Sequence, residues 1–400
     1  MNKPLPGPLD GIRILDLTRV VAGPYCSMFL GDLGAEVVKV EQPGFGDDTR
    51  GWGPPFTGGE SAYYLCINRN KQSITLDLKS IEGVELLRQM TEVADVVIEN
   101  FRPGTMERLG LGEQELRQFN PRLIYASLTG FGADGPMSDW PGYDLIVQAW
   151  GGLMSITGTP EGEPVKVGVA IVDLVAGLML GKAITAALFA RERLGLGQRI
   201  DTSLLEAEVA SLINVGSNYL ISGKIPSRWG NAHPNIVPYQ NFKTADGYFV
   251  LGVASETIWR RFCPAIGRPD LTEDSRFADN AKRVENRTAL IALLTEIFLS
   301  RTNQTWLKLF NDAEVPCAPV QTVDQVFQSP QVLHRDMLVG VEHPTAGKVP
   351  MAGVPVKFSL TPASVRLPPP LLGEHNRQVL KGWLDMSDEA IEELKRKKIV

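Results

Sequence analysis

Apolar and polar positions alternate in blocks through the first part of the chain, and the blocks predict strands and helices in turn. Short apolar runs have the length of buried strands at 12–17, 36–41, 73–78, 95–99 and 123–128. Longer segments with spaced apolar positions separate them and predict helices at 24–33, 81–93 and 113–119. Strands that alternate with helices favour an open, mostly parallel sheet covered on both faces, so the predicted fold class is α/β.

The longest apolar stretch lies at 167–190 and contains a single acid, Asp173, and a single base, Lys182. Its first residues, 167–172, are β-branched and predict a strand, whereas the residues from Leu174 onward are helix-forming. Asp173 is therefore expected to be the first residue of a long internal helix. A buried ionised carboxylate is costly unless it is paired or hydrogen-bonded, so an acid at this position needs a specific reason.

Three interpretations of Asp173 are open on the residues alone. A membrane-spanning helix is disfavoured, because Asp173, Lys182, Gly177 and Gly181 interrupt the apolar run. A buried core helix that Asp173 caps is the structural alternative. In the third interpretation, backbone N–H groups and the helix dipole favour the carboxylate anion, which attacks an acyl group as a nucleophile.

The composition changes near Ser222. A hairpin is predicted around Asp246-Gly247, and the helical segments that follow it are rich in Arg, Asp and Asn, so we expect a smaller α+β domain at 228–330. Elements outside it are predicted as helices at 143–153, 204–221, 374–384 and 387–397, and as strands at 198–201, 337–344 and 351–360.

Composition narrows the function classes. The 400 residues carry a net charge of −6 and a pI near 5.5, which disfavours nucleic acid and membrane surfaces as partners. The four cysteines have no C-x-x-C spacing and the four histidines have no ligand spacing, so a reduced, cytoplasmic protein without a metal site is expected. Any phosphate-bearing ligand has to be held by a local basic cluster.

The corner between the first strand and the first helix can receive a phosphate group. It has no G-x-G-x-x-G pattern, so a nicotinamide dinucleotide site has weak support. A glycine- and proline-rich loop follows at 44–59, and long loops inside a compact domain are usually functional.

A series of short motifs follows in a fixed order: T-R-V-V-A-G-P, V-K-V-E-Q-P-G, G-D-D-T-R, N-R-N-K-Q-S-I-T-L-D, V-V-I-E-N-F-R-P-G, G-Y-D, V-G-V-A-I-V-D-L-V-A-G and P-P-P-L-L-G-E-H. Together they resemble the family III coenzyme A transferases, which include formyl-CoA transferase and carnitine CoA-transferase, with α-methylacyl-CoA racemase as a relative. The segments R-W-G-N-A-H-P-N-I-V-P-Y and G-W-G-P-P-F are most similar to the succinate–hydroxymethylglutarate CoA-transferase branch. That branch implies dicarboxylate substrates with succinyl-CoA or glutaryl-CoA.

The resemblance implies a fold and an assembly. It implies a Rossmann-like large domain formed by 1–220 and 345–400, a small domain at 228–330, and linkers at 221–227 and 331–344. It also implies an interlocked homodimer. The small domain matches the change in composition.

The resemblance also implies a mechanism in which Asp173 is the nucleophile. Acyl-CoA and an organic acid are then the substrates, no cofactor is permanently bound, and a mixed anhydride and an aspartyl-CoA thioester are intermediates. Formyl-CoA transferase shields the anhydride with a tetraglycine loop, and this chain contains no such run.

Several positions match residues that contact CoA in the family: Val20, Val21, Leu76, Lys79, Asn100, Arg108 and Leu109. Gln42 stands where some members have an arginine, and Lys39 is the expected replacement for its phosphate contact. Arg102 is a further candidate near Arg108. The alternative to a CoA contact for Lys79 and Arg108 is that each side chain is a solvated charge on a helix surface.

Two neighbouring residues, Tyr143 and Asp144, help to distinguish a transferase from a racemase within the family. Racemase relatives have a histidine at the tyrosine position that moves the α-proton, which Tyr143 cannot readily do near neutral pH. Asp144 matches an acidic position near the transferase active site, and we assign it a supporting role. The alternative for Tyr143 is a core aromatic whose hydroxyl is hydrogen-bonded.

The second carboxylate of a dicarboxylate needs a cation, and guanidinium groups match carboxylates well. The candidates are Arg50, Arg69 and Lys71. His233, flanked by Trp229 and Pro234, is a separate candidate for a substrate contact, and each of the four has a structural role as its alternative. Val21 stands where formyl-CoA transferase has an active-site glutamine, which argues against oxalate as the acceptor.

The sequence therefore predicts a CoA-transferase acting on a dicarboxylic acid. An acyl-CoA racemase or isomerase is an alternative that Tyr143 disfavours. A CoA-binding subunit of a heteromeric transferase is a second alternative, and the presence of Asp173 counts against it.

Overall fold

The computed structural model describes residues 5–400 of the chain, which form two compact units. The larger unit contains the described residues up to Leu153 together with Val167–Ile221 and Pro330–Val400, and the smaller one contains Met154–Lys166 and Ser222–Ser329. Residues 154–166 belong to the smaller unit rather than to the expected large domain, and residues 331–344 belong to the larger unit rather than to a linker.

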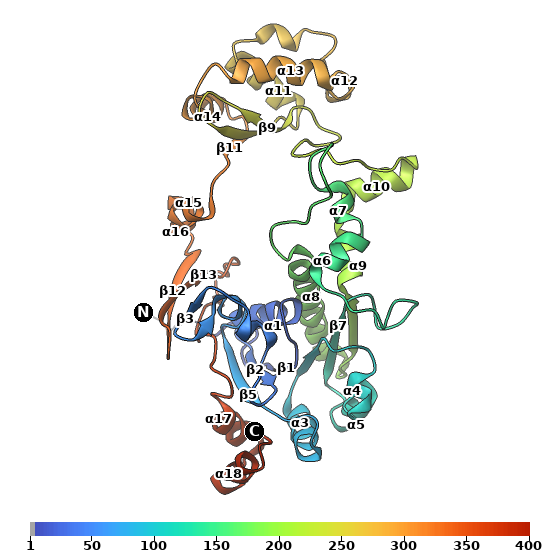
Figure 1. The fold of residues 1–400 in the computed structure, drawn as a ribbon, viewed down its shortest axis with the longest axis vertical. Helices are drawn as coiled ribbons and strands as arrows, with labels where there is room; N and C mark the ends of the chain where they lie inside the picture. The colour runs from blue at the N-terminus through green and yellow to red at the C-terminus, as the bar shows by residue number, and fades with distance from the viewer. Residues whose placement is uncertain (1–4) are drawn as a thin grey trace. The chain divides into compact units, whose positions relative to one another are not determined.

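A six-stranded sheet forms the centre of the larger unit (Figure 1), and every neighbouring pair of strands in it is parallel. The strand order is β5 (Lys71–Thr75), β2 (Glu36–Glu41), β1 (Arg13–Asp16), β6 (Val96–Glu99), β7 (Ile124–Thr129) and β8 (Arg199–Ser203). The predicted α/β class with a parallel sheet is confirmed. The order is the doubly wound one, in which the sheet grows outward in opposite directions from β1 and β6.

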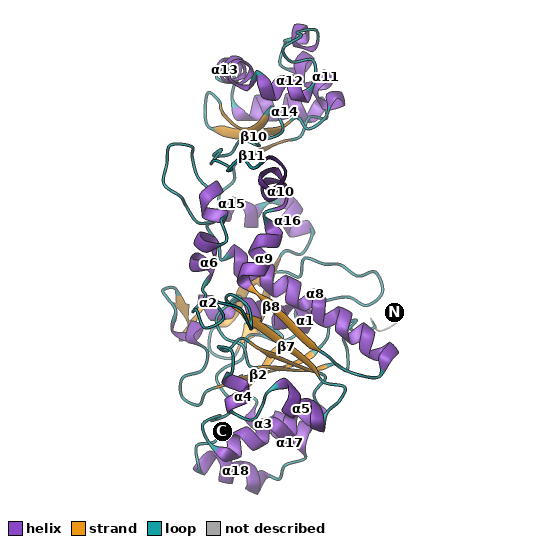
Figure 2. Ribbon diagram, turned by 90° about the vertical axis from the view of Figure 1, so that its right-hand side faces the viewer, coloured by secondary structure: helices purple, strands orange, loops and turns teal. Residues whose placement is uncertain are grey.

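Helices cover both faces of this sheet. Figure 2 shows the strands between two sets of helices: α1 (Ala22–Asp32) and α8 (Ile171–Leu194) pack on one face, and α3 (Ile81–Val93), α5 (Glu113–Phe119) and α17 (Asn376–Leu384) on the other. Neighbouring residues of β1 point to opposite cores, since Ile14 belongs to the first and Leu15 to the second. Because both faces are covered, the strands are apolar throughout, which made them recognisable as short apolar runs.

Helix α8 begins at Ile171, so the predicted strand at 167–172 is wrong. The Val167 N–H donates to Gln148 Oε1 at 2.9 Å, in a loop that leads into the helix. Gly177 lies where α8 approaches α1, because a Cβ at this position would lie 2.5 Å from the Ala22 carbonyl oxygen. The small residue therefore allows the first half of α8 to pack closely on α1.

Within the described residues, α8 is the one helix that length and composition would allow to cross a membrane. Its residues Val172, Ala176, Leu180 and Ile184 are buried in the core beneath the sheet. Packing inside the larger unit therefore accounts for this face of the apolar helix.

Two predicted helices are each divided in the structure. The first becomes α6 (Asp144–Trp150) and α7 (Leu153–Ile156), and the second becomes α9 (Leu204–Ser211) and α10 (Ile213–Ser222). The other elements are η1 (Asp48–Gly51), β3 (Phe56–Thr57), β4 (Glu60–Ser61), α2 (Ala62–Leu65), α4 (Thr105–Arg108), α16 (Pro330–His334), β12 (Leu338–His343), β13 (Gly347–Ala352) and α18 (Asp388–Arg396).

The C-terminal part of the chain completes the larger unit. Strands β12 and β13 form an antiparallel hairpin, and the strand predicted at 351–360 lies instead at 347–352. The start of α17 lies along edge strand β5: the Thr75 N–H donates to Asn376 Oδ1 at 2.8 Å, and the Ser73 N–H donates to His375 Nδ1 at 3.3 Å. These hydrogen bonds cover an otherwise open sheet edge.

The smaller unit is α+β. Its antiparallel sheet has the order β11 (Cys317–Pro319), β10 (Tyr248–Gly252) and β9 (Tyr239–Lys243), and the predicted hairpin around Asp246-Gly247 is confirmed. Its helical elements are α11 (Glu256–Ala265), η2 (Pro269–Thr272), α12 (Asn280–Glu285), α13 (Arg287–Phe298), α14 (Asn303–Asp312) and α15 (Val323–Gln328). An aromatic core that includes Trp259, Phe298 and Trp306 joins these helices to the sheet.

Candidate active site

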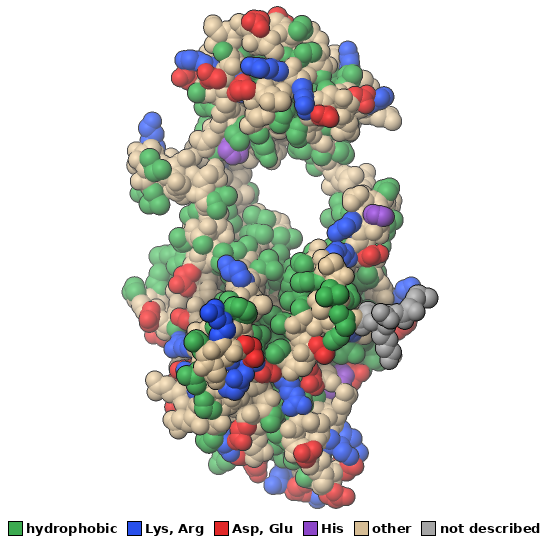
Figure 3. Space-filling model, turned by 180° about the vertical axis from the view of Figure 1, so that it is seen from behind, with side chains coloured by type: hydrophobic (Ala, Val, Ile, Leu, Met, Phe, Trp, Pro, Cys, Tyr) green, Lys and Arg blue, Asp and Glu red, His purple; other side chains and the backbone are tan. Residues whose placement is uncertain are grey.

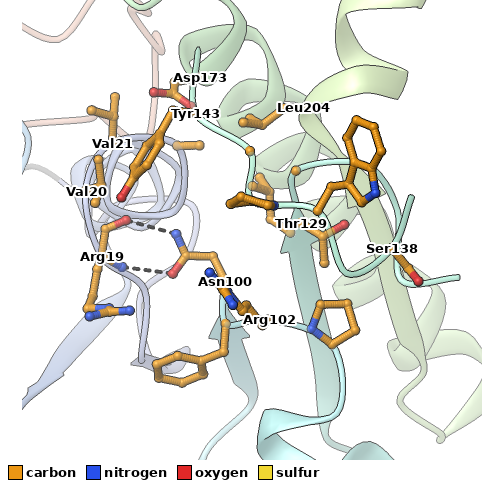
Figure 4. Close-up of a pocket in the computed structure, with 18 of the residues that line it drawn as sticks. Arg19, Val20, Val21, Asn100, Arg102, Thr129, Ser138, Tyr143, Asp173 and Leu204 are labelled. Carbon is orange, nitrogen blue, oxygen red and sulfur yellow. Dashed lines mark hydrogen bonds between the residues drawn. The ribbon is translucent and has the colours of Figure 1, made fainter. Parts of the chain in front are cut away.

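The loops after β1 and β6 meet at the carboxyl edge of the sheet, where ligands of doubly wound proteins bind. Asn100 fixes the first of these loops: its Oδ1 accepts from the Arg19 N–H at 3.0 Å and its Nδ2 donates to the Arg19 carbonyl at 2.9 Å (Figure 4). The next residue, Val20, has a φ of 70°, which is an unfavourable left-handed conformation for a β-branched residue. The Val20 N–H donates to Asp47 Oδ1 at 3.3 Å, so this conformation is held from both sides.

A cavity of about 270 Å³ opens at this edge. Its wall brings together six of the predicted site residues from separate segments of the sequence: Val20, Val21, Asn100, Arg102, Tyr143 and Asp173. Figure 4 shows these side chains with Arg19, Thr129, Ser138 and Leu204, which also line the cavity.

Asp173 is the third residue of α8, and its side chain is 8% exposed. Among the described residues, no backbone N–H of the first turn donates to the Asp173 side chain, so the interpretation that Asp173 caps the helix is wrong. Within the described part of the chain, the Asp173 carboxylate has no hydrogen-bond or ion-pair partner, and it lies in the cavity wall. The group is therefore desolvated but accessible from the cavity.

The cap of α8 comes from helix α6. Asp144 Oδ1 accepts from the Val172 N–H at 2.9 Å, and Asp144 Oδ2 accepts from Gln148 Nε2 at 2.6 Å. Gln148 Oε1 in turn accepts from the Val167 N–H, and both side chains are buried. Asp144 and Gln148 thus hold the loop before α8 and its first turn, which fixes the helix that carries Asp173.

The pKa of Asp173 is raised from 3.8 to about 7, chiefly by burial and in addition by the negative charge of Asp144. The helix N-terminus was expected to favour the anion, but this effect is about 0.3–1 kcal/mol. A shift of roughly three units corresponds to about 4 kcal/mol, so desolvation dominates. The free site therefore holds a carboxyl group that ionises near neutral pH.

Aromatic side chains surround this carboxyl group. Tyr143 is 60% exposed, so the alternative that it is a core aromatic is wrong. Trp140 is part of the same wall and packs edge-on against Trp150 at 5.5 Å between ring centroids. Burial and the charge of Asp173 raise the pKa of Tyr63, which follows the glycine-rich loop and contacts Trp52 of that loop at 5.2 Å.

The sequence analysis did not single out Tyr63 or Trp140 as site residues. The one available signal for Tyr63 was its place just after the long loop at 44–59, which was predicted to be functional. Trp140 follows a segment with no recognised pattern.

A second cavity, of about 300 Å³, adjoins the first and shares Arg19 and Phe101 with it. Three residues predicted to contact CoA line it: Leu76, Lys79 and Leu109. Arg108 is exposed and donates to the hydroxyl of Thr105, another residue of this wall, at 2.9 Å. Arg19 was not predicted, yet it lines both cavities, and its guanidinium pairs with exposed Asp48 at 3.6 Å.

Lys39 also belongs to the wall of the second cavity, but its ammonium group has other partners. It lies 2.8 Å from Asp47 Oδ2, donates to the Thr18 carbonyl at 2.8 Å, and is fully buried. We therefore correct the expectation that Lys39 replaces the phosphate contact missing at Gln42. Its ion pair fixes the loop after β1 and the loop after β2 instead.

Three cations predicted to bind a substrate carboxylate are likewise engaged inside the larger unit. Each is paired with an acid on a neighbouring element, and all three acids are buried. The pairs are Lys71–Asp16 at 3.1 Å, Arg69–Asp32 at 2.8 Å and Arg50–Glu41 at 2.7 Å. These cations have structural partners, so the assignment of Arg50, Arg69 and Lys71 to the substrate is corrected. The remaining candidate, His233, belongs to the smaller unit.

The larger unit thus combines a parallel, doubly wound sheet with a desolvated carboxylate in the cavity at its switch point. The model of CoA-transferase family III matches residues 9–376, and the chain belongs to that family.

The relatives and a solved structure agree with this family. The chain is 47% identical to human succinyl-CoA:glutarate CoA-transferase, over 97% of this chain and 88% of that protein. It is 44% identical to the succinate–glutarate CoA-transferase of Agrobacterium fabrum, over 93% of this chain and 95% of that protein. The crystal structure of a CaiB/BaiF family protein from Brucella suis matches it with a TM-score of 0.83 at 42% identity, covering 95% of this chain and all of that one.

Proposed function

We propose that this protein exchanges CoA between succinyl-CoA or glutaryl-CoA and a free dicarboxylate. Two relatives, at 47% and 44% identity, are named succinyl-CoA:glutarate CoA-transferase and succinate–glutarate CoA-transferase. The observation that carries the proposal is the Asp173 carboxylate, which is buried, unpaired within the described residues, and in the wall of the cavity at the switch point.

In the first half-reaction, ionised Asp173 attacks the thioester carbonyl of the acyl-CoA. The C–S bond breaks, CoA leaves as a thiolate, and a mixed anhydride forms. The thiolate then attacks the aspartyl carbonyl, which breaks the anhydride C–O bond, releases the first acid as a carboxylate and leaves an aspartyl-CoA thioester. The second acid repeats both steps in reverse, so no proton or oxidant is consumed.

The surroundings of Asp173 suit this chemistry in two ways. Burial removes water that would stabilise the carboxylate and hydrolyse the anhydride. The cap from Asp144 holds the first turn of α8, so the attacking oxygen stays in one position while covalent bonds form and break.

The two cavities adjoin each other, with Arg19 and Phe101 in both walls, so one elongated ligand can occupy both. We propose that Leu76, Lys79 and Leu109, with Arg108 nearby, contact the nucleotide end, and that Arg102 and Asn100 lie along the pantetheine. Val20 and Val21 then face the acyl end, next to Asp173. The acyl-CoA is bound as a substrate in this arrangement.

Trapping tests the covalent step. Hydroxylamine added after incubation with succinyl-CoA should convert Asp173 to a hydroxamate that peptide mass spectrometry locates. Asp173→Ala should lose this product and the transfer activity but still bind CoA in calorimetry. The control is Asp312→Asn, an exposed acid paired with Lys308 at 2.8 Å, which should behave like the wild type. Full activity of Asp173→Ala, or a hydroxamate on another acid alone, contradicts the mechanism.

We also propose that the protein is a homodimer and works in the cytoplasm. Large apolar side chains are exposed on helices α8 to α10: Leu178, Phe189, Val209, Ile213, Leu220 and Ile221. Figure 3 shows hydrophobic side chains gathered on one face of the larger unit. Exposed apolar patches on soluble proteins mark interaction surfaces. Sedimentation of the wild type as a dimer, and of Ile221→Glu as a weakened one, tests the assembly.

A further inference from the structure

Val20 lies in the wall of the cavity that contains Asp173 (Figure 4), and its backbone is strained. Its φ of 70° is in the left-handed region, where a β-branched side chain crowds its own backbone. Such conformations persist only where the surrounding structure fixes them, and they gather at functional sites. The groups that hold Val20 are therefore candidates for a role in the reaction.

Three side chains from other segments hold the loop that contains Val20. Lys39, on β2, donates to the Thr18 carbonyl at 2.8 Å, and Asn100 engages both backbone groups of the residue before Val20. Asp47 holds Val20 itself, because Asp47 Oδ1 accepts from the Val20 N–H at 3.3 Å. Each residue from Thr18 to Val20 is thus fixed by a side chain from outside the loop.

Asp47 is itself fixed from several sides, so it can hold Val20. Its side chain is buried, Oδ1 also accepts from the N–H and the hydroxyl of Thr49 at 2.9 and 2.7 Å, and Oδ2 lies 2.8 Å from the Lys39 ammonium. Its own N–H donates to Glu41 Oε1 at 2.9 Å. Burial alone would raise the pKa of Asp47, but the charge of Lys39 and the hydrogen bonds lower it overall, so Asp47 is an anion.

From these contacts we infer that Asp47 is a positioning residue of the transfer reaction. It keeps Val20 in the left-handed conformation, and this conformation sets the shape of the cavity wall around the nucleophile. A change of φ at Val20 rotates its side chain relative to the preceding peptide group, so that the bound acyl group and the Asp173 carboxylate no longer meet in the same geometry. The inference rests on the proposed function and adds to it a residue that acts through Val20.

The first test is a double-mutant cycle. Asp47→Ala removes the acceptor of the Val20 N–H, so kcat for CoA transfer should fall about ten- to hundred-fold, the population change expected when such backbone strain is released. Glycine adopts a positive φ as readily as a negative one. In a protein that already carries Val20→Gly, the loss caused by Asp47→Ala should therefore be at least about five-fold smaller. An equal loss in both backgrounds means that Asp47 has only a structural role, and it would overturn the inference.

Asp32 supplies a matched control for the loss of a buried acid. It is buried, pairs with Arg69 at 2.8 Å, and is the last residue of α1, whose first residue, Ala22, lines the cavity. Asp32→Ala also leaves a buried cation without its acid, so it should lower the free energy of unfolding in the same way as Asp47→Ala. Its effect on kcat should be the same with and without Val20→Gly.

The second test keeps Asp47 and its ion pair with Lys39, so it does not depend on a variant that leaves a buried charge unpaired. Val20→Pro removes the N–H and forbids a positive φ, whereas Val20→Ala shortens the side chain but keeps the N–H. The kcat of Val20→Pro should be about ten- to hundred-fold below that of Val20→Ala. Equal kcat values in the two variants would also overturn the inference.

The third measurement needs no turnover. Hydrogen exchange of the Val20 N–H, read by mass spectrometry, should be slow in the wild type, fast in Asp47→Ala and still slow in Asp32→Ala. Fast exchange in the wild type contradicts the inference. The two proposals can therefore fail separately. If the protein transfers no CoA, the proposed function fails, and the exchange still decides whether Asp47 holds Val20. If it transfers CoA but Asp47→Ala costs the same in both backgrounds, only the role of Asp47 fails.

Discussion

Replacing Asp173 by asparagine should stabilise the ligand-free protein at pH 8 and leave its stability unchanged near pH 4. Asp173 ionises near pH 3.9 in an unfolded chain, whereas its pKa in the folded protein is about 7. Between these two values the folded state binds more protons than the unfolded state, so the free energy of unfolding falls as the pH rises. Asparagine is neutral throughout and avoids this loss.

The size of the effect follows from the shift. The pKa of Asp173 rises from 3.8 to about 7, which is roughly three units and corresponds to about 4 kcal/mol. The Asp173 side chain is 8% exposed, so water screens little of this free-energy difference. This shift is the net of every interaction of the anion in the folded protein, so the expected gain at pH 8 is about 4 kcal/mol.

Urea unfolding at a series of pH values measures this gain, at equal protein concentration and without CoA. The difference between Asp173→Asn and the wild type should grow by about 1.4 kcal/mol per pH unit from pH 5 to pH 7 and then stay constant. Asp312→Asn should show no such dependence, since that acid is exposed. A difference that is independent of pH, or a wild type that gains stability over the variant as the pH rises, would refute the reasoning.

Two further predictions concern charges around the site. Asp144→Asn should move the acidic limb of the pH profile of kcat/KM to lower pH by at most about one and a half units. The charge of Asp144 is the smaller of the two causes of the raised pKa of Asp173, so its removal lowers that pKa by less than half of the shift. A limb that does not move contradicts this prediction. Lys71→Met should lower the free energy of unfolding by about 3–5 kcal/mol, because it leaves buried Asp16 without its cation. Arg261→Gln is the control, because it removes an exposed ion pair with Glu314. It should lower the free energy of unfolding by less than about 1 kcal/mol in the same assay.

The elements that were predicted well are those whose signals are local. Helix α3 has the predicted bounds of 81–93, and the Ser80 hydroxyl before it accepts from the Gly83 N–H at 3.0 Å. Strand β2 lies at 36–41 as predicted, because a parallel strand buried on both faces is a short apolar run. In both cases the residues within the element determine where it ends.

The strand predicted at 167–172 failed because a distant side chain decides its conformation. Val167 and its neighbours are β-branched, but the Val167 N–H donates to Gln148 and the Val172 N–H to Asp144. Both acceptors lie on α6, about twenty or more positions earlier in the sequence. Local preference for a strand is weak and was overridden by these tertiary hydrogen bonds.

The same limit applies to the candidate site. The motif around Asp173 singled out the acid, but the sequence does not show that the nearby acid Asp144 caps its helix or that burial raises its pKa. For the cations, the sequence shows the charge but not its partner. Lys71 on β5 pairs with Asp16 on β1, and strand β2 lies between these two strands. Such pairs form only when the strands assemble, so paired and free cations could not be separated beforehand.

Tyr63 is the residue that the structure adds to the chemistry, and its role can be tested. Burial and the charge of Asp173 raise its pKa, so the phenol experiences the charge of the nucleophile and remains a neutral O–H donor. A negative oxygen develops on the acyl carbonyl when Asp173 attacks, and a nearby donor stabilises it. Tyr63→Phe should therefore lower kcat about 100-fold, the usual cost of one such donor, while the inhibition constant of free CoA stays unchanged. Trp52→Phe, which keeps an aromatic ring against Tyr63, should retain more activity. If Tyr63→Phe keeps the full kcat, the oxyanion is stabilised by other groups.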